Sequence, residues 1–400
     1  MTHILGVDQQ DAHKMAKNDV PYLVEIKVTP QSGEEPYRLY LMAPTLPAKQ
    51  RWVNALQVAT NRRMLSARIP SARLIDNMFL RLPEPHNLAV RCAGQVDSKY
   101  VVLGCEQGLY FTFAQNPNIP EKVAGVDSVF QLEIIHAADT VVLITGDERR
   151  LAFIHLDSLI QSFNSRNPGV NVTRAGDFTL CHIFKYLITN HKKYLCVADP
   201  DKFHLMNFNN RLQIFTPFVH FITNEPVSCI EPFGQDKVLI GTEKFLLVEL
   251  KSGEVKEFLD SEDQSLEYCT QKAEHRQDYP VAAVLLNNEN ITEVLLAYQN
   301  FGIMVDTQGR RTRRTTIEWI RSPLSLYFTK PYLYVVHFES VEIFYVPEFT
   351  GINCECLVQK SLLEIASPQI VGEGINEGDV FVASIRPTST DILSLNAFER

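Results

Sequence analysis

The stretch of this sequence best suited to bind a ligand is GRRTRR, which contains Arg310, Arg311, Arg313 and Arg314. A guanidinium group binds carboxylates and phosphates through paired hydrogen bonds, so clustered arginines can recognise an acidic partner. The chain has a net charge of −9, so this basic run contrasts with its surroundings. We expect the arginines to open an outer β-strand and to dock an acidic protein. The alternative, which is the commoner outcome for a run of charges, is a solvated rim that forms salt bridges with acidic loops such as LDSEDQSLE, residues 259–267.

Motifs that carry chemistry in common enzyme classes are missing from the sequence. A protein kinase needs a glycine-rich loop, an HRD-type catalytic loop and a DFG motif, and an α/β-hydrolase needs G-x-S-x-G. None of these occurs as a functional motif in the sequence. The glycines of VGEGINEG (371–378) precede the strand-like DVFVAS and no helix, so we expect a loop there and not a phosphate site. We therefore predict no catalytic residue and no cofactor.

The cysteines and histidines do not form a metal-binding pattern. The histidines include no HxH or HExxH pair, and Cys354 and Cys356 lack the second pair that a zinc site requires. Five histidines lie in or beside apolar runs, where structural roles are the commoner case: His155, His182, His204, His220 and His337. We therefore predict no metal site.

The composition limits the class of protein. Hydrophobic residues make up 45% and charged residues 21%, an ordinary balance for a globular chain. The acidic net charge opposes nucleic-acid binding, which requires an excess of Lys and Arg to displace phosphate counterions. Eight cysteines without CxxC spacing indicate reduced thiols. We find no signal peptide and no run of about 18 uncharged apolar residues, so we expect a cytoplasmic protein.

A repeated pattern organises most of the chain. DKVLIGTEKFLLVEL (236–250) joins two apolar runs through a small polar turn. Six other stretches do the same: YVVLGCEQGLYFTF (100–113), TVVLITGDERRLAFIHL (140–156), YLCVADPDKFHLMNF (194–208), EVLLAYQNFGIMVD (293–306), YLYVVHFESVEIFYV (332–346) and DVFVASIRPTSTDILSL (379–395). Their spacing averages about 47 residues, the length of one four-stranded propeller blade.

The first run of each pair is apolar throughout, which predicts a strand buried on both faces, as radially packed blades require. Seven units predict an all-β fold, a seven-bladed β-propeller over residues 87–400. A two-layer β-sandwich is the competing fold, but its strands usually alternate and such a domain seldom reaches roughly 300 residues. An α/β fold is disfavoured because no amphipathic helices of about 10–15 residues lie between the pairs.

Residues 1–63 do not follow the repeat. We expect strands at 22–28 and 37–43 and then a helix over about 47–62, with Trp52 on its apolar stripe. With the motif LYLMAPTLPAKQRWVNAL, this stretch resembles the C-terminal part of a pleckstrin-homology (PH) domain. The chain is therefore expected to begin inside that domain. The phosphoinositide-binding residues of the PH family lie on a first hairpin that is missing here, so the resemblance does not support lipid binding.

Residues 64–86 contain three prolines and are expected to form a linker or closing segment. Because a closed propeller must join its two ends, we expect part of 64–96 to pair near 391–398. Two long segments between the repeats, 157–180 and 251–280, are second candidates for recognition, since loops on a rigid scaffold often carry it.

Three stretches of the propeller region resemble the citron-homology (CNH) family. They are YVVLGCEQGLYF (100–111), VLIGTEKFLLVEL (238–250) and, most characteristic, LLAYQNFGIMVDTQGRRTRRTTIEWIRSPLSLYFTKPYLYVVHFESVEIF (295–344). With a PH ending in front, the arrangement is most similar to citron-type Rho-interacting Ser/Thr kinases. Myotonic-dystrophy-kinase-related Cdc42-binding kinases are next.

The resemblance implies a non-catalytic scaffold region, whose kinase domain and coiled coil lie outside this sequence. It implies docking of a Rho-family small GTPase and of cytokinesis or cytoskeletal proteins, at the cleavage furrow and midbody. Three alternatives stay open. The first is that the chain is the CNH region of a Cdc42-binding kinase or Rho exchange factor. The second is that it targets membranes with help from its PH part. The third is that it is an enzyme with carboxylates or histidines converging at the propeller axis.

Overall fold

The computed structural model describes residues 2–5, 23–28, 37–42, 73–175, 178–209, 211, 214–266, 269, 278–287, 292–352 and 354–398. The chain divides into two compact units, Met1–Ala72 with Glu399–Arg400, and Arg73–Phe398.

In the first unit, an antiparallel sheet is formed by β1 (Thr2–Leu5), β2 (Leu23–Val28) and β3 (Tyr37–Met42), in that order. Strands were predicted where β2 and β3 lie, and β1 was not predicted. The helix expected over 47–62 lies outside the described residues, so the assignment of 1–63 to a PH domain stays a prediction.

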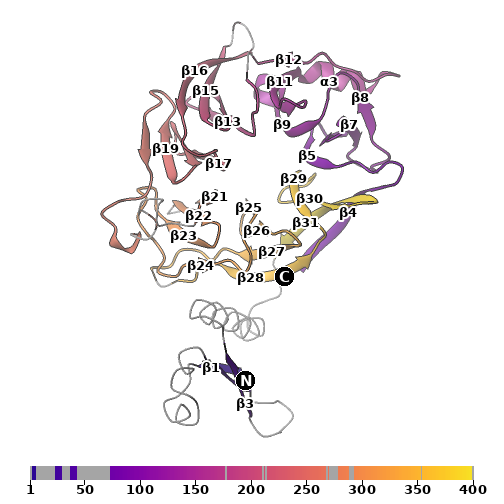
Figure 1. The fold of residues 1–400 in the computed structure, drawn as a ribbon. Helices are drawn as coiled ribbons and strands as arrows, with labels where there is room; N and C mark the ends of the chain where they lie inside the picture. Colours follow the sequence, from indigo (N-terminus) through magenta and orange to yellow (C-terminus); the bar gives the residue numbers. More distant parts are fainter. Residues whose placement is uncertain are drawn as a thin grey trace. The chain divides into compact units, whose positions relative to one another are not determined.

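The second unit is a ring of seven four-stranded antiparallel sheets around a central axis (Figure 1). The predicted all-β, seven-bladed propeller is confirmed. The first three blades are β5 (Val90–Gln95), β6 (Tyr100–Cys105), β7 (Gly108–Phe113) and β8 (Glu121–Val123); β9 (Val129–Ile135), β10 (Thr140–Thr145), β11 (Arg150–His155) and β12 (Thr173–Arg174); and β13 (Ile183–Thr189), β14 (Lys192–Ala198), β15 (Lys202–Asn209) and β16 (Ile214–Ile222).

The next three blades follow the same order. They are β17 (Cys229–Phe233), β18 (Lys237–Gly241), β19 (Phe245–Glu249) and β20 (Val255–Glu257); β21 (Pro280–Asn287), β22 (Thr292–Tyr298), β23 (Phe301–Val305) and β24 (Ile317–Glu318); and β25 (Ser325–Thr329), β26 (Tyr332–Val336), β27 (Ser340–Tyr345) and β28 (Val358–Glu364).

The seventh blade closes the ring with strands from both ends of the unit. It contains β29 (Pro368–Glu373), β30 (Val380–Arg386), β31 (Ser389–Phe398) and β4 (Arg73–Pro83). Strand β4 pairs antiparallel with β31, from Arg73 opposite Phe398 to Pro83 opposite Ser389. The predicted pairing of part of 64–96 with 391–398 is confirmed. Asp391 on β31 also accepts a hydrogen bond from Arg81 Nε on β4 at 2.9 Å.

The second strand of each blade forms the core. All six residues of β6 and all five of β26 are buried, because each face packs against a neighbouring blade. The small residue at the predicted strand end has a packing role. A Cβ on Gly104 would lie 2.4 Å from Cys92 Sγ and 2.7 Å from a Val129 methyl, so only glycine lets blades 1 and 2 approach this closely.

The long segment 157–180 begins with a helix that was not predicted. Helix α3 (Leu156–Phe163) buries Leu156, Leu159 and Phe163, and the Phe163 ring stacks on Phe111 of blade 1 at 4.3 Å. The helical spacing of these residues is a usable signal, but the helix is shorter than the roughly 10–15 residues expected of an amphipathic helix in an α/β fold. Two 3-10 turns, η2 (His136–Ala138) and η3 (Gln264–Leu266), complete the described elements. None of the described helices is long and apolar enough to cross a membrane.

Candidate functional site

The arginine segment, residues 310–314, lies in the loop between β23 and β24. It therefore does not open an outer strand, as was expected, because a tight turn precedes it. Asp306 Oδ1 accepts hydrogen bonds from the backbone N–H groups of Gln308 at 2.8 Å and Arg310 at 2.9 Å. Gly309 has φ +77°, and a Cβ there would lie 2.1 Å from the Phe258 carbonyl oxygen. The turn consequently packs directly against blade 4.

Arg313 is the largest fully buried side chain among the described residues, with 0% exposure. Its Nε donates to Glu293 Oε1 on β22 at 3.1 Å, and Glu293 is also 0% exposed. Its Nη2 donates to Glu293 and, at 2.9 Å, to the Pro347 carbonyl, while Nη1 donates to the Glu355 carbonyl. Burial acts to lower the pKa of Arg313, but the hydrogen bond and charge of Glu293 outweigh it and hold that pKa above its usual value.

The prediction that Arg313 contacts a partner is therefore wrong for this structure. A charge run in the sequence shows only that arginines are adjacent. It does not reveal that the third one inserts between blades and pairs with a carboxylate twenty positions earlier. The buried pair holds the β23–β24 loop to the segment that follows β27.

Arg310 and Arg311 pair with the acidic loop 259–267, which was the alternative interpretation of the arginine run. Arg310 Nε lies 2.9 Å from Asp260 Oδ2, and the Arg310 side chain is 64% exposed. The Arg311 backbone N–H donates to Asp263 at 3.0 Å. Its guanidinium donates to the Arg313 carbonyl at 2.9 Å and the Arg314 carbonyl at 3.0 Å within its own loop, and to the Ser265 carbonyl of the acidic loop at 3.3 Å.

Arg314 is exposed, and only its backbone is bonded in the described structure: its N–H donates to the Ile352 carbonyl at 2.8 Å, and its carbonyl accepts from Arg311. Arg310 and Arg314 are thus the two members of the segment that face solvent. Partner binding by these two residues stays a prediction.

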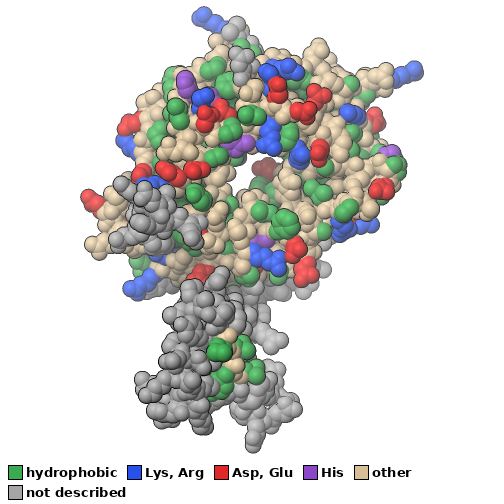
Figure 2. Space-filling model, in the orientation of Figure 1, with side chains coloured by type: hydrophobic (Ala, Val, Ile, Leu, Met, Phe, Trp, Pro, Cys, Tyr) green, Lys and Arg blue, Asp and Glu red, His purple; other side chains and the backbone are tan. Residues whose placement is uncertain are grey.

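The propeller axis is open, as Figure 2 shows. A cavity of about 690 Å³ lies beside the axis, lined mainly by the inner strands β5, β9 and β29. Its polar lining includes Arg91, Gln131, Glu133, Lys185, Tyr327 and Glu373.

The sign of the charged side chains beside this channel alternates from one blade to the next. Burial raises the pKa of Glu133 on β9, and it raises the pKa of Glu231 on β17 to about 7. The charge of Lys185, on β13 between them, opposes both shifts. Burial also raises the pKa of Tyr327, and the charge of Glu373 adds to it. Carboxylates therefore do converge near the axis, the feature named above as the mark of a channel enzyme.

Polar side chains beside the channel form hydrogen bonds between neighbouring blades. Gln131 donates from Nε2 to the Phe184 carbonyl at 2.8 Å and accepts from the Phe184 N–H at 3.0 Å, which ties β9 to β13. Gln369 Nε2 on β29 donates to the Arg91 carbonyl on β5 at 3.0 Å. Among the described cavity-lining residues, no Ser, Thr or Cys side chain contacts a general base, as an activated nucleophile would. The channel side chains can take up protons, and their bonds rigidify the ring.

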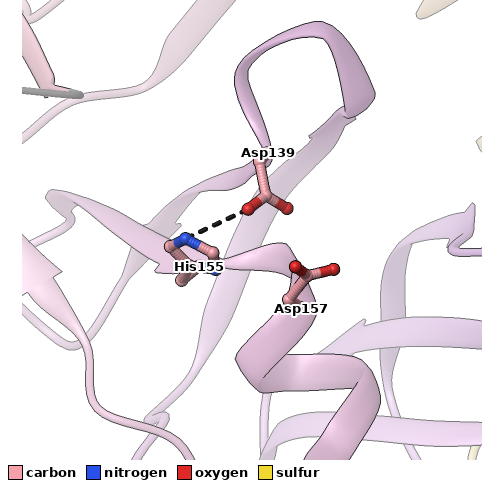
Figure 3. Close-up of side chains that lie close together, drawn as sticks. All are labelled: Asp139, His155 and Asp157. Atoms are coloured by element: carbon pink, nitrogen blue, oxygen red, sulfur yellow. Dashed lines mark ion pairs between the residues drawn. The ribbon is translucent and has the colours of Figure 1, made fainter.

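A second polar cluster was not predicted because its residues are separated in sequence. Asp139, His155 and Asp157 place one ligand atom each within 4.8 Å of one another (Figure 3). Pairing of β10 with β11 sets Thr140 opposite His155, which brings Asp139 to the same end of the hairpin.

Each side chain of this cluster has a local electrostatic interaction. His155 Nε2 lies 3.0 Å from Asp139 Oδ2, and His155 is 62% exposed. Asp157 lies in the first turn of α3, where a carboxylate stabilises the partial positive charge of a helix N-terminus.

Other histidines named in the sequence make local bonds. His182 Nε2 lies 2.8 Å from the Val227 carbonyl, and His204 Nε2 lies 3.0 Å from Asp199. His337 is buried 3.1 Å from Glu342. All eight cysteines are free thiols.

Comparison with known protein families matches residues 97–364 to the CNH domain. The chain belongs to the CNH family. The family resemblance carried by the three sequence stretches is confirmed, while the PH part is not covered by this match.

This CNH chain is similar to several kinases and to solved structures. It is 33% identical over 387 residues to citron rho-interacting kinase of Rattus norvegicus, covering 95% of this chain and 18% of that protein. It is 32% identical to the Homo sapiens protein (95% and 19%) and 21% identical over 361 residues to serine/threonine-protein kinase MRCK alpha of Homo sapiens (85% and 19%). The chain spans about a fifth of the length of these relatives.

The AfRom2 CNH domain has the same fold, with a TM-score of 0.66 and 16% identity, covering 82% of this chain and all of that domain.

Proposed function

We propose that this CNH propeller is the non-catalytic interaction region of a citron-type Rho-interacting kinase. In this role it docks a Rho-family small GTPase together with cytoskeletal proteins of dividing cells. The observation that carries the proposal is the 33% identity, over 95% of this chain, to a protein named for its interaction with Rho. We further propose a cytoplasmic location, with recruitment to the cleavage furrow and midbody.

The physical form of the propeller supports a docking role. Inter-blade bonds such as those of Gln131 and Gln369, and the closing pair of β4 with β31, make a rigid ring that presents loops at fixed positions. Loops held by a rigid scaffold are suited to recognition. The exposed arginines of the arginine segment, Arg310 and Arg314, are suited to the carboxylates of a GTPase surface.

A capture experiment with the purified chain tests this function. Rho-family GTPases, with Cdc42 included because of the similarity to MRCK alpha, are loaded with GDP or a GTP analogue and passed over the immobilised chain. We expect retention of at least one member that depends on the bound nucleotide. Absence of retention for every member in both nucleotide states contradicts the proposed function.

The same experiment separates the function from the arginine segment. Arg310→Glu with Arg314→Glu is expected to weaken retention. The matched control is Arg166→Glu with Arg174→Glu, which makes the same charge change at two exposed positions of blade 2. If the first pair binds as well as the control pair, the arginine segment is not the docking site, and the function itself stands.

A further inference from the structure

Three bulky apolar side chains are exposed together at one end of blades 5 and 6. Ile320 is 52% exposed, Leu324 is 56% exposed and Phe338 is 71% exposed. Ile320 and Leu324 lie in the loop between β24 and β25, and Phe338 lies in the turn between β26 and β27. We call these three residues the apolar patch.

Hydrogen bonds fix the two loops of the apolar patch to each other. The Leu324 N–H donates to the Val336 carbonyl at 2.8 Å, which places Leu324 next to the turn that carries Phe338. Arg321 Nη1 lies 3.4 Å from Glu339 Oε2, which joins the residues after Ile320 to the residue after Phe338. The patch is therefore pre-organised, and a partner would lose little affinity in ordering it.

Buried groups support the apolar patch from below. Trp319, the neighbour of Ile320, is buried and donates from Nε1 to the Tyr298 carbonyl at 3.0 Å. His337, the neighbour of Phe338, is 1% exposed and lies 3.1 Å from Glu342 Oε2. The exposed position of Ile320 and Phe338 thus follows from anchored neighbours in each loop.

The rim of the apolar patch is acidic. Glu318 and Glu364 are exposed at the ends of β24 and β28, and the Ile365 N–H donates to the Glu339 carbonyl at 3.2 Å, which brings Glu364 to the same turn. Asp278 accepts a hydrogen bond from Asn300 Nδ2, and the Asn300 carbonyl accepts from the Trp319 N–H at 3.3 Å, next to Ile320.

Four carboxylates thus lie on segments next to the patch, from Asp278, Glu318, Glu339 and Glu364. Arg321 is a cation within this rim, and Glu339 pairs with it.

We propose that the apolar patch docks a protein segment with bulky apolar side chains flanked by Lys or Arg. The inference rests on the interaction function proposed above and adds a second docking surface, for a partner other than the GTPase. Burial of an exposed aromatic side chain at the centre of an interface is a common source of binding energy. The acidic rim complements a basic segment and repels both an acidic segment and an anionic membrane surface. This partner therefore differs in charge from the one that Arg310 and Arg314 would select.

Fluorescence anisotropy with two labelled peptides tests the apolar patch. The first probe is a fluorescein-labelled 15-residue peptide of Leu and Lys with its leucines at helical spacing, and the second has Glu in place of every Lys. Each is titrated with the full chain at physiological salt. We expect saturable binding of the Lys peptide and none of the Glu peptide. Equal affinity for the two peptides would overturn the proposal.

Three variants locate the binding. Phe338→Ser is expected to weaken binding of the Lys peptide at least about tenfold, because a buried aromatic contact is lost. The control Ile188→Ser, at a side chain 56% exposed on β13, is expected to leave the affinity unchanged. Glu318→Lys with Glu364→Lys is expected to weaken binding about fivefold or more. If Phe338→Ser binds as well as Ile188→Ser, the patch is not the site.

GTPase capture, run in parallel on the same proteins, separates the two proposals. Loss of peptide selectivity with GTPase retention intact overturns the apolar patch and leaves the proposed function standing. Absence of GTPase retention overturns the proposed function, and with it the role of the apolar patch in that function. Thermal unfolding of Phe338→Ser and Ile188→Ser should match the wild type, since both side chains are largely exposed.

Discussion

Replacement of Arg313 by methionine separates a structural arginine from a docking arginine within one short segment. The substitution keeps much of the side-chain volume and removes the guanidinium. It leaves Glu293 as a carboxylate with 0% exposure, whose remaining recorded partner is the Thr312 hydroxyl. The carbonyls of Pro347 and Glu355 also lose their bonds from Arg313.

The expected cost follows from these contacts. Removal of one partner of a buried ion pair costs about 3–5 kcal/mol, because the other charge stays buried without compensation. Each buried carbonyl left without a donor adds about 1 kcal/mol. We therefore expect Arg313→Met to lower the free energy of unfolding by about 4 kcal/mol or more. Arg310→Met removes an exposed ion pair with Asp260 and should cost less than about 1 kcal/mol.

Thermal unfolding of the full chain, followed by circular dichroism, measures the difference. For a domain of this size we expect Arg313→Met to lower the midpoint by about 6–8 °C and Arg310→Met by less than about 2 °C. The double variant Arg313→Met with Glu293→Leu replaces both charges by apolar groups and should recover more than half of the loss. Similar midpoints for Arg313→Met and Arg310→Met would refute the assignment of Arg313 to the core.

Three further substitutions test the ring and its channel. Glu231→Gln should raise stability by about 1–2 kcal/mol at pH 8 and little at pH 5, with exposed Glu225→Gln as the unchanged control. Burial raises the pKa of Glu231 from 4.5 to about 7. Ionisation of this carboxyl group therefore lowers the free energy of unfolding as the pH rises through that window, and Gln removes this loss. Leu82→Ala, at a buried position of β4, should lower the free energy of unfolding by about 2–4 kcal/mol in chemical denaturation. Met78→Ala, exposed on the same strand, should lower it by less than about 1 kcal/mol. Equal losses would argue against ring closure by β4. Gly104→Ala should cost about 1–3 kcal/mol by the same measurement, and a neutral result would show that blades 1 and 2 can separate at this point.

The propeller could be predicted because its core leaves a periodic record in the sequence. A second strand such as β26 is buried at every position, so it is apolar at every position and recurs once per blade. The closing strand could be anticipated because a ring must join its ends. Its register could not, since no local feature of 73–83 specifies that Arg73 pairs with Phe398.

The sites were less predictable because they combine residues from different blades. Glu133 and Glu231 lie on inner strands nearly a hundred residues apart, so no spacing rule connects them. The sequence showed the charges of the arginine segment but not the burial of Arg313, which depends on Glu293 of the adjacent strand. Ile320 and Phe338 lie in or beside apolar runs, where the same residue types usually indicate a core strand, so their exposure was not apparent.

Calorimetric titration of the purified chain with a Rho-family GTPase bearing a GTP analogue tests the central claim most directly. We predict a saturable isotherm for at least one member, with a different affinity for its GDP form. Titrations that give no binding heat for any Rho-family member, at several temperatures and in both nucleotide states, would contradict the claim that this CNH propeller is a GTPase-docking region.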